Sequence, residues 1–263
     1  MSEAERPHIL LTNDDGIGAE GLHALADALA ADYDLLIIAP DRERSATGHA
    51  ITVLKELRLE KYERDGKRWG WSFEGRPADC VKMAVKILSK ERPFDMVISG
   101  INRGQNLGVN TLYSGTVAAA REGVLMGIPS IAFSVAYNDI RKVRFDTAAQ
   151  VARDLTAKAL SRGLPPGVFL NVNVPAIDIG KIEGYAITKQ GNSGFGDKFE
   201  HVEGHPDHSA LYRNVGDRFY ESTTDHHDLD DRAIRRNEVS ITPLHVDATA
   251  YQHLADLEDL TAR

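Results

Sequence analysis

The chain has 263 residues, of which 42% are hydrophobic and 27% charged, values typical of a soluble folded protein with a full core. Its net charge of −8 argues against a binding surface for nucleic-acid polymers, because such a surface needs clustered Lys and Arg. The single cysteine, Cys80, excludes an intrachain disulfide and a cysteine-based metal site. The polar start contains no signal-peptide core and no apolar run approaches a membrane span, so we expect a cytoplasmic protein without membrane contact.

Short apolar runs alternate with segments of helical periodicity over the first 175 residues. A strand–helix alternation of this kind predicts an α/β fold with a doubly wound, mainly parallel sheet. Segments 51–62 and 68–73 are rich in β-forming residues and predict a hairpin. The other expected strands cover residues 9–11, 34–39, 95–99, 129–134 and 168–174, and the expected helices cover 19–31, 77–90, 115–126 and 145–160.

The pattern changes after residue 175. A strand is expected at 183–190 and another at 239–244, with a short last helix at 251–260. The segment between these strands is dense in Gly, His, Asp and Asn and has no helical period. We therefore expect a core made of residues 1–190 together with 238–263, and an extended arm or hairpin at 191–237. The aromatic side chains of this arm are costly to leave in water, which predicts a role in contacts between subunits.

Two adjacent carboxylates, Asp14 and Asp15, follow the first expected strand. Open α/β sheets bind their ligands at the carboxyl ends of strands. Neighbouring carboxylates repel each other, and a hard divalent cation would relieve that repulsion. The alternative is ordinary turn chemistry, since Asn, Asp and Gly are favoured in any strand-to-helix turn.

Further oxygen donors follow the next strands. Ser45 lies in the polar loop after the second strand, and Asn102 lies after the strand at 95–99. Hydroxyl, amide and carboxylate oxygens suit Mg²⁺, Mn²⁺ or Ca²⁺, whereas Zn²⁺ favours Cys and His. Ser114 is expected to cap the helix at 115–126, and Gly127 to end it. The backbone N–H groups at such a helix start form a natural seat for an anion such as phosphate.

Taken together, these motifs resemble the stationary-phase survival protein SurE family. The resemblance is carried by TNDDG at 12–16, APDRERSATGH at 39–49, GRPADCV at 75–81, SGINRGQNLG at 99–108, YSGTVAAAREG at 113–123, PSIAFS at 129–134, NVNVP at 171–175 and VSITPL at 239–244. It implies a Rossmann-like core with a C-terminal arm, and dimers or tetramers. It also implies a divalent-metal-dependent phosphomonoesterase that hydrolyses nucleoside monophosphates at the 5′ position, with 3′-nucleotidase and exopolyphosphatase activity as further possibilities.

The resemblance places the ligands of one divalent ion per subunit, Mg²⁺ or Mn²⁺ with Ca²⁺ as an alternative, on Asp14, Asp15, Ser45 and Asn102. Either Asp14 or Asp15 then serves catalysis by orienting the attacking water, and the residues leave this choice open. The sequence departs from the family pattern in the His-rich segment 191–237 and at Asn237-Glu238. These departures concern substrate range and subunit contacts.

Substrate contacts are expected from the third loop and the helix start. Asn106 is assigned to the substrate, although it and Asn110 are equally compatible with loop structure. The hydroxyl and N–H groups of Ser114, Gly115 and Thr116 are expected to hold phosphate oxygens. Ser114 is interpreted as a cap and not as a nucleophile, because no base stands beside it in the sequence. Arg42, Arg44 and Arg103 can pair with phosphate or remain solvated.

Other interpretations fit the residues less well. A haloacid-dehalogenase-type phosphatase needs two Asp residues separated by one position, whereas Asp14 and Asp15 are adjacent. A P-loop enzyme needs GxxxxGK[ST], which the sequence lacks. The sequence NDDGIG does not match a dinucleotide-binding glycine fingerprint. The histidines between 201 and 227 have no compact metal-ligand spacing and predict a solvated arm. A nucleotide-binding regulator without turnover is the alternative outside the enzymes, and the complete ligand set argues against it.

Overall fold

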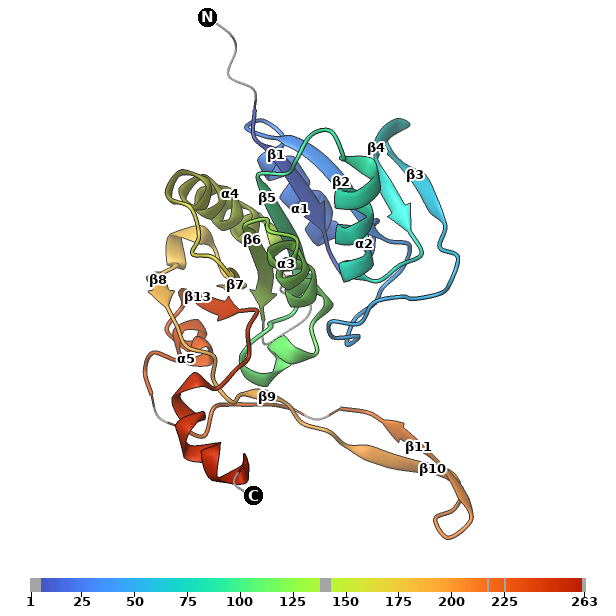
Figure 1. Ribbon diagram of the computed structural model, residues 1–263, viewed down its shortest axis with the longest axis vertical. Coiled ribbons are helices and arrows are strands. Elements are labelled where there is room, and N and C mark those ends of the chain that lie inside the picture. Colours follow the sequence, from blue (N-terminus) through green and yellow to red (C-terminus); the bar gives the residue numbers. More distant parts are fainter. Residues whose placement is uncertain (1–5, 138–142, 217, 225, 262–263) are drawn as a thin grey trace, which may run out of the picture.

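A computed structural model describes residues 6–137, 143–216, 218–224 and 226–261. Within these residues a mixed, mainly parallel sheet of nine strands runs through the molecule in the order β3-β4-β2-β1-β5-β6-β7-β13-β8 (Figure 1). The expected doubly wound α/β architecture is therefore confirmed. The strands are β1 His8–Thr12, β2 Asp34–Pro40, β3 Leu59–Arg64, β4 Lys67–Phe73, β5 Met96–Arg103, β6 Ser130–Ala136, β7 Val168–Pro175, β8 Gly184–Ile187 and β13 Glu238–His245.

Strand β1 lies at the centre of this sheet and pairs in parallel with β2 on one side and β5 on the other. The order in which strands are added reverses at β1: β2 and β4 extend one half of the sheet, and β5, β6 and β7 extend the other. Such a reversal opens a crevice at the carboxyl ends of the central strands. The loops after β1, β2 and β5 all begin at this edge of the sheet.

Helices cover both faces of the sheet because successive side chains of a strand point to opposite faces. On one face, Ile9 and Leu11 of β1 join a core with Leu22 and Leu25 of α1. On the other face, Leu10 packs in a cluster with Val81 of α2. The helices are α1 Glu20–Leu29, α2 Pro77–Met83, α3 Gly115–Leu125, α4 Phe145–Arg162 and α5 Asp230–Arg235.

Several element boundaries differ from the sequence-based expectation. The hairpin strand β3 begins at Leu59 and not near residue 51, because residues 51–58 have no strand partner and instead anchor to α2. The helix expected at 77–90 is α-helical only to Met83 and continues as one π-helical segment, Ala84–Leu88. Strand β5 extends to Arg103, so Asn102 lies on the strand and not in the following loop. The end of the chain forms 3₁₀ turns and not an α-helix.

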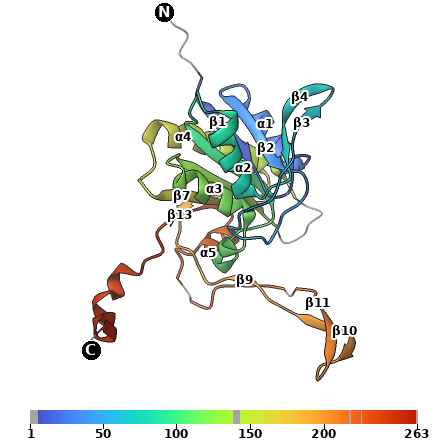
Figure 2. The same ribbon diagram turned by 45° about the vertical axis from the view of Figure 1, so that its right-hand side comes forward.

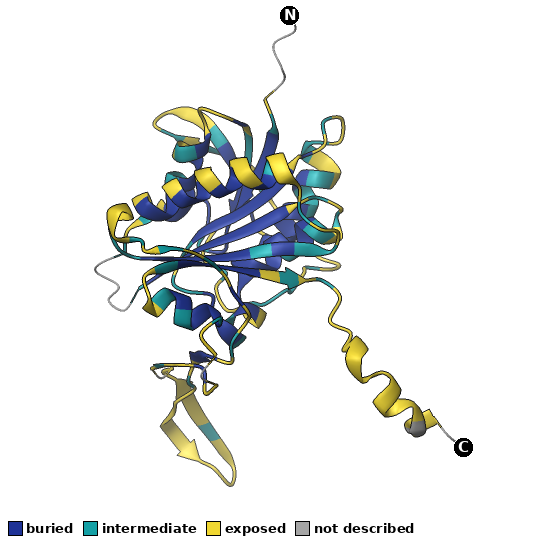
Figure 3. Ribbon diagram, turned by 90° about the vertical axis from the view of Figure 1, so that its left-hand side faces the viewer, coloured by how far each residue is buried: buried dark blue, intermediate teal, exposed yellow. Residues whose placement is uncertain are grey.

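A long hairpin, β10 Phe199–His205 with β11 Ser209–Asn214, projects away from the sheet (Figures 1 and 2). It joins the body of the protein through a second short pair, β9 Gly194–Phe195 with β12 Phe219–Tyr220. The hairpin and the C-terminal turns are almost entirely exposed, in contrast to the buried sheet (Figure 3). No helix in the described part of the chain is long and apolar enough to cross a membrane.

Candidate active site

A cavity of about 880 Å³, lined by polar and aromatic side chains, lies over the carboxyl edge of the central strands. It brings together Asp14 after β1, Ser45 after β2, Asn102 on β5, and Asn106 and Ser114 from the following segment. Asp15 lies in an adjoining cavity of about 470 Å³, whose wall also contains Ser45. Most of the site residues expected from the sequence therefore surround one continuous hollow, although they come from four separate segments.

The carboxylate of Asp14 is buried and held by the start of α3. The Thr116 hydroxyl donates a hydrogen bond to Asp14 Oδ1, and the N–H groups of Gly115 and Thr116 also contact this carboxylate. A Cβ atom on residue 115 would lie 2.7 Å from Asp14 Cβ, so only glycine permits this close approach. Burial raises the pKa of Asp14, while the hydrogen bonds from Thr116 and Gly115 oppose that rise.

Asp15 is less buried, and its Oδ2 accepts a hydrogen bond of 3.3 Å from the backbone N–H of Arg103. Burial, the neighbouring charge of Asp14 and that of Glu43 raise the pKa of Asp15 to about 6. The charge of the Arg103 guanidinium opposes this rise in part, and the same group forms an ion pair of 2.7 Å with Glu20. The two adjacent carboxylates thus form a site that a bound cation would stabilise in the ionised form.

Ser45 and Asn102 line the same cavity as Asp14, and they come from the loop after β2 and from β5, the two strands that neighbour β1. The Ser45 hydroxyl donates to Glu43 Oε1 at 2.8 Å. The Asn102 amide nitrogen donates to the carbonyl of Gly104 at 2.7 Å, so its side-chain oxygen is the atom left for a ligand. Register between β5 and β6 shifts between Ser99 and Asn102, and this irregularity turns the end of the strand at the site.

The expected anion seat at α3 has two parts. Ser114 is confirmed as the helix cap, since its Oγ accepts a hydrogen bond of 3.1 Å from the N–H of Val117, and it lines the cavity. Gly127, with φ of 81°, is confirmed at the end of the same helix. The polar groups of Gly115 and Thr116 are directed at Asp14 in this structure. Their contact with a substrate phosphate stays a prediction.

Asn106 is fixed by a buried amide network that sequence reasoning did not find. Its N–H donates to Asn173 Oδ1 at 2.8 Å, and its carbonyl accepts from Asn171 at 2.7 Å and from Asn173 at 3.2 Å. Its own amide donates to Ser134 Oγ at 2.8 Å. The motif NVNV in β7 carries the signal, because two Asn residues at alternate positions put their side chains on one face of a buried strand.

The base of the hairpin also lines the cavity, a second feature that sequence reasoning missed. Phe195, Phe219 and Tyr220 belong to β9 and β12 and close one side of the hollow. Segment 191–231 was expected to serve subunit contacts, and its aromatic residues were the available signal. Asn110 also lines this side, and its Oδ1 accepts a hydrogen bond from the N–H of Phe195. Its amide nitrogen has no hydrogen-bond partner within the described part of the chain.

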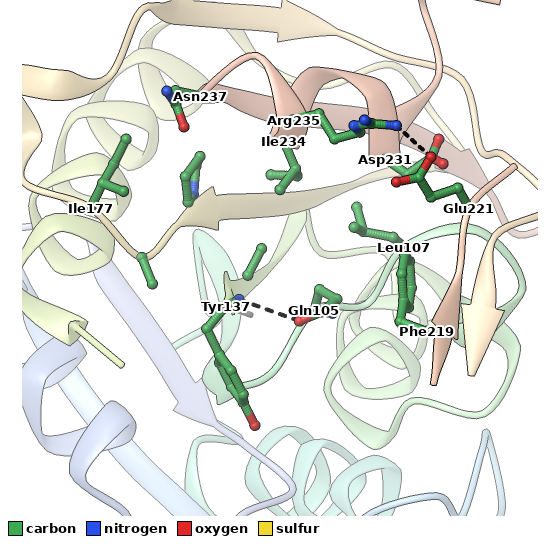
Figure 4. A pocket seen from close by; sticks show the side chains of 13 residues that line it. Gln105, Leu107, Tyr137, Ile177, Phe219, Glu221, Asp231, Ile234, Arg235 and Asn237 are labelled. Atoms are coloured by element: carbon green, nitrogen blue, oxygen red, sulfur yellow. Dashed lines mark hydrogen bonds and ion pairs between the residues drawn. The ribbon is translucent and has the colours of Figure 1, made fainter. Parts of the chain in front are cut away.

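A second pocket of about 600 Å³ adjoins the cavity (Figure 4). The two hollows share Gln105, Tyr137 and Phe219. Leu107 and Ile234 form apolar walls in the second pocket, and Gln105 is held by a 3.4 Å hydrogen bond from the N–H of Tyr137 (Figure 4). The combination of apolar and aromatic walls with amide groups suits a planar heterocyclic group.

The donor set fits a hard divalent cation. Asp14 and Asp15 offer carboxylate oxygens, Ser45 a hydroxyl oxygen and Asn102 an amide oxygen, which are the ligand types that Mg²⁺ and Mn²⁺ take. Burial raises the pKa of both carboxyl groups, and the charge of Arg103 opposes this rise at Asp15 only in part. Across the described ranges, no group of three or more His, Cys, Asp or Glu residues could hold a metal ion. A metal site here therefore depends on neutral oxygen donors beside the two Asp residues.

Comparison with known proteins gives a consistent result. The family model described as "Survival protein SurE" matches residues 9–197. The chain is 45% identical over 254 residues to the 5′-nucleotidase SurE of Desulfatibacillum aliphaticivorans, covering 96% of this chain and 97% of that protein. It is 42% identical to the protein of the same name from Syntrophus aciditrophicus, with 97% and 94% covered. The crystal structure of the SurE protein from Aquifex aeolicus matches with a TM-score of 0.83 at 35% identity, covering 97% of this chain and all of that one. The chain belongs to the SurE family.

Proposed function

We propose that this protein is a divalent-metal-dependent 5′-nucleotidase that hydrolyses nucleoside monophosphates to nucleoside and phosphate. Its relatives at 40–45% identity over nearly their full length carry the name 5′-nucleotidase SurE, which supports this activity. The observation that carries the proposal is the pair Asp14 and Asp15, two adjacent carboxylates that line two adjoining cavities and whose pKa values burial raises. Phosphomonoester hydrolysis needs a cation at such a pair, because carboxylates alone would repel the substrate.

Four side chains are proposed to hold one ion per subunit: Asp14, Asp15, Ser45 and Asn102. Mg²⁺ or Mn²⁺ fits these oxygen donors, with Ca²⁺ as a non-catalytic substitute. When bound, the ion polarises a phosphoryl oxygen and neutralises charge that develops in the transition state. Asp14 is held by Thr116 and is assigned to ion binding. Asp15 accepts a hydrogen bond from one donor among the described residues, the Arg103 N–H, and is the carboxylate we assign to orienting the attacking water.

The substrate is proposed to span both hollows. Ser114, Asn106 and the unpaired amide of Asn110 contact the phosphate from the cavity wall. Gly115 and Thr116 contribute through the positive end of α3. The nucleoside then extends past Tyr137 and Phe219 into the second pocket, whose aromatic and apolar walls suit a base.

Phosphate release from a panel of nucleotides tests this function. Purified protein treated with EDTA is assayed with 5′- and 3′-nucleoside monophosphates and short polyphosphate, with and without added Mg²⁺ or Mn²⁺. We expect phosphate release from 5′-nucleotides only with a divalent ion. The same panel measures whether the protein also has 3′-nucleotidase and exopolyphosphatase activity. The Asp14→Asn variant is the control for a contaminating phosphatase. Equal turnover with and without EDTA would contradict the proposal.

We also propose a homo-oligomer, a dimer or a tetramer. The hairpin exposes Phe199, Val202, Leu211 and Tyr212, and the C-terminal turns expose Tyr251, Leu254, Leu257 and Leu260. Apolar side chains in such number on projecting segments are unfavourable in water and favour contact with another subunit.

A further inference from the structure

A carboxylate buried in α3, outside the cavity, has two basic partners. Glu122 is 3% exposed, and its Oε2 lies 2.8 Å from His49 Nε2. Its other oxygen, Oε1, lies 2.6 Å from the Lys82 ammonium of α2. Burial by itself would raise the pKa of Glu122, but the hydrogen bonds and charges of His49 and Lys82 lower it. Glu122 is therefore ionised at neutral pH, and His49 Nε2 carries the proton that it accepts.

His49 connects this carboxylate to the loop that carries Ser45. Residues 41–58 lie between β2 and β3 and contain no helix or strand. The backbone on both sides of Ser45 is attached to the site: Arg44 N–H donates to the Asp14 carbonyl at 2.7 Å, and Gly48 N–H donates to the Tyr113 carbonyl at 2.8 Å. His49 adds a side-chain anchor directly after the second of these bonds, four residues beyond Ser45.

Stability alone does not explain a buried charge at this position. Replacing a buried ion pair by apolar side chains of similar volume is often neutral or stabilising. A carboxylate with hydrogen-bonded partners on both oxygens instead fixes the relative position of the elements that supply them. Glu122 lies on the same helix as Thr116, so the first turn of α3 holds Asp14 and a later turn holds the Ser45 loop.

We propose that His49 and Glu122 are positioning residues that hold Ser45 beside Asp14 and Asp15 for metal binding. Lys82 binds the second oxygen of the Glu122 carboxylate and so prevents the carboxylate from rotating away from His49. Neither His49 nor Glu122 is among the residues that line the two cavities of the site, so they act through the loop and not on the substrate. This inference rests on the proposed assignment of Ser45 as a metal ligand.

Two measurements on His49→Ala and His49→Gln test the proposal. Calorimetric titration of the EDTA-treated protein with Mn²⁺ gives the metal affinity without any turnover. Limited trypsin digestion, followed by mass spectrometry of cleavage after Arg42, Arg44, Lys55 and Arg58, reports the order of the loop. We expect His49→Ala to bind Mn²⁺ about tenfold more weakly, as when other supports of a metal ligand are removed, and to be cut faster in this loop. His49→Gln keeps a donor for Glu122 and should restore most of both properties.

The matched control is His8→Ala. His8 is a buried histidine, stacked on Phe94 with the ring centroids 4.4 Å apart, and it lies at the opposite end of β1 from the site, whereas His49 is partly buried. Its loss should lower the melting temperature while leaving Mn²⁺ affinity and loop cleavage unchanged. If His49→Ala does not fold, Glu122→Gln carries the same test, because it retains the side-chain volume and removes the charge.

Ser45→Ala separates failure of this inference from failure of the ligand assignment. Wild-type Mn²⁺ affinity in His49→Ala together with weakened binding in Ser45→Ala would overturn the positioning role and retain Ser45 as a ligand. Wild-type affinity in both variants would overturn the ligand assignment and the positioning role with it. Equal weakening in His8→Ala and His49→Ala would also overturn the inference, because it would reveal a general loss of stability.

Discussion

The hydroxyl of Thr116 donates a hydrogen bond to Asp14 Oδ1 from a position 102 residues further along the chain. The bond joins the start of α3 to the loop after β1, and it fixes one of the two carboxylates proposed to bind the ion. Because the donor favours the ionised carboxylate, it opposes the rise in the pKa of Asp14 that burial causes. Removing it is the most direct way to change that carboxylate without touching its charge.

We therefore expect Thr116→Val, which keeps the shape of the side chain, to weaken Mn²⁺ binding and lower activity. A hydrogen bond to a charged group contributes about 1.5–3 kcal/mol. Its loss raises the pKa of Asp14 further, so the acid limb of the pH–rate profile should move to higher pH. The profile of Thr116→Ser, which keeps the hydroxyl, should match the wild type. An unchanged acid limb in Thr116→Val would show that Asp14 does not control it.

The Asp14→Asn variant should retain the fold, and its activity should fall by at least about 100-fold. Asn is close in size to Asp, but it removes a full negative charge from the proposed ligand set of a divalent ion. Initial rates across a Mn²⁺ titration, with circular dichroism to confirm the fold, measure the effect. Near-normal turnover at low Mn²⁺ would contradict the metal assignment.

The metal-free protein should lose stability as the pH rises from about 4 to about 6. Asp15 has a raised pKa of about 6 in the folded state, against an ordinary value of 3.8, so the folded state holds more protons over this interval. Asp14 and Glu43 face Asp15 with like charge, while Arg103 opposes them. Melting temperatures with EDTA and with Mn²⁺ measure the effect, and the ion should stabilise more at pH 8 than at pH 5.

Asp15→Asn is the control for this pH dependence. Asn does not titrate, so the decline in melting temperature between pH 4 and 6 should become shallower in the EDTA-treated variant. Stabilisation by Mn²⁺ should also be smaller at pH 8, since one proposed ligand has lost its charge. A pH dependence equal to that of the wild type would assign the titration to other groups.

Ser114→Ala should lower stability by about 1 kcal/mol, the usual effect of removing a helix cap. Its hydroxyl accepts from the N–H of Val117, which would then lose its partner. The variant should also bind inorganic phosphate more weakly, with Mn²⁺ affinity nearly unchanged. Urea denaturation and product inhibition measure the two effects. A phosphoserine trapped at Ser114 in the wild type would contradict our mechanism by identifying a covalent nucleophile.

Shortening the hairpin should change the oligomeric state. A variant in which residues 199–214 are replaced by a short turn keeps β9 and β12, which line the cavity, and removes Phe199, Leu211 and Tyr212. Light scattering of the intact protein at micromolar concentration should give at least a dimer, and the shortened variant should give a smaller assembly. A monomeric intact protein would show that the hairpin is a free arm.

The sequence was sufficient for those features that depend on local chemistry. The apolar run of Ile9, Leu10 and Leu11 predicted the first buried strand, and the cap at Ser114 was identified from residue type and spacing alone. In both cases the signal and the structure lie within a few residues of each other.

Features that depend on long-range pairing were not predictable from such signals. The contact of Thr116 with Asp14 requires the strand order that places α3 over the end of β1. In the sequence, Asn171 and Asn173 look like ordinary strand residues. Their role is visible only in the folded chain, where both form hydrogen bonds with Asn106. The β-forming segment 51–58 remained outside the sheet because the loop carrying Ser45 and His49 is anchored to the helices, which leaves the segment without a strand partner.

The buried thiol of Cys80 offers a built-in reporter for the variants described above. It is fully inaccessible, packed in the cluster with Leu10 and Val81, and burial raises its pKa well above that of a free thiol. A thiol reagent can therefore react only when α2 separates from the sheet. Since Cys80 is the only cysteine in the chain, the labelling rate measures opening of the layer beneath the active site in every variant, without an added probe.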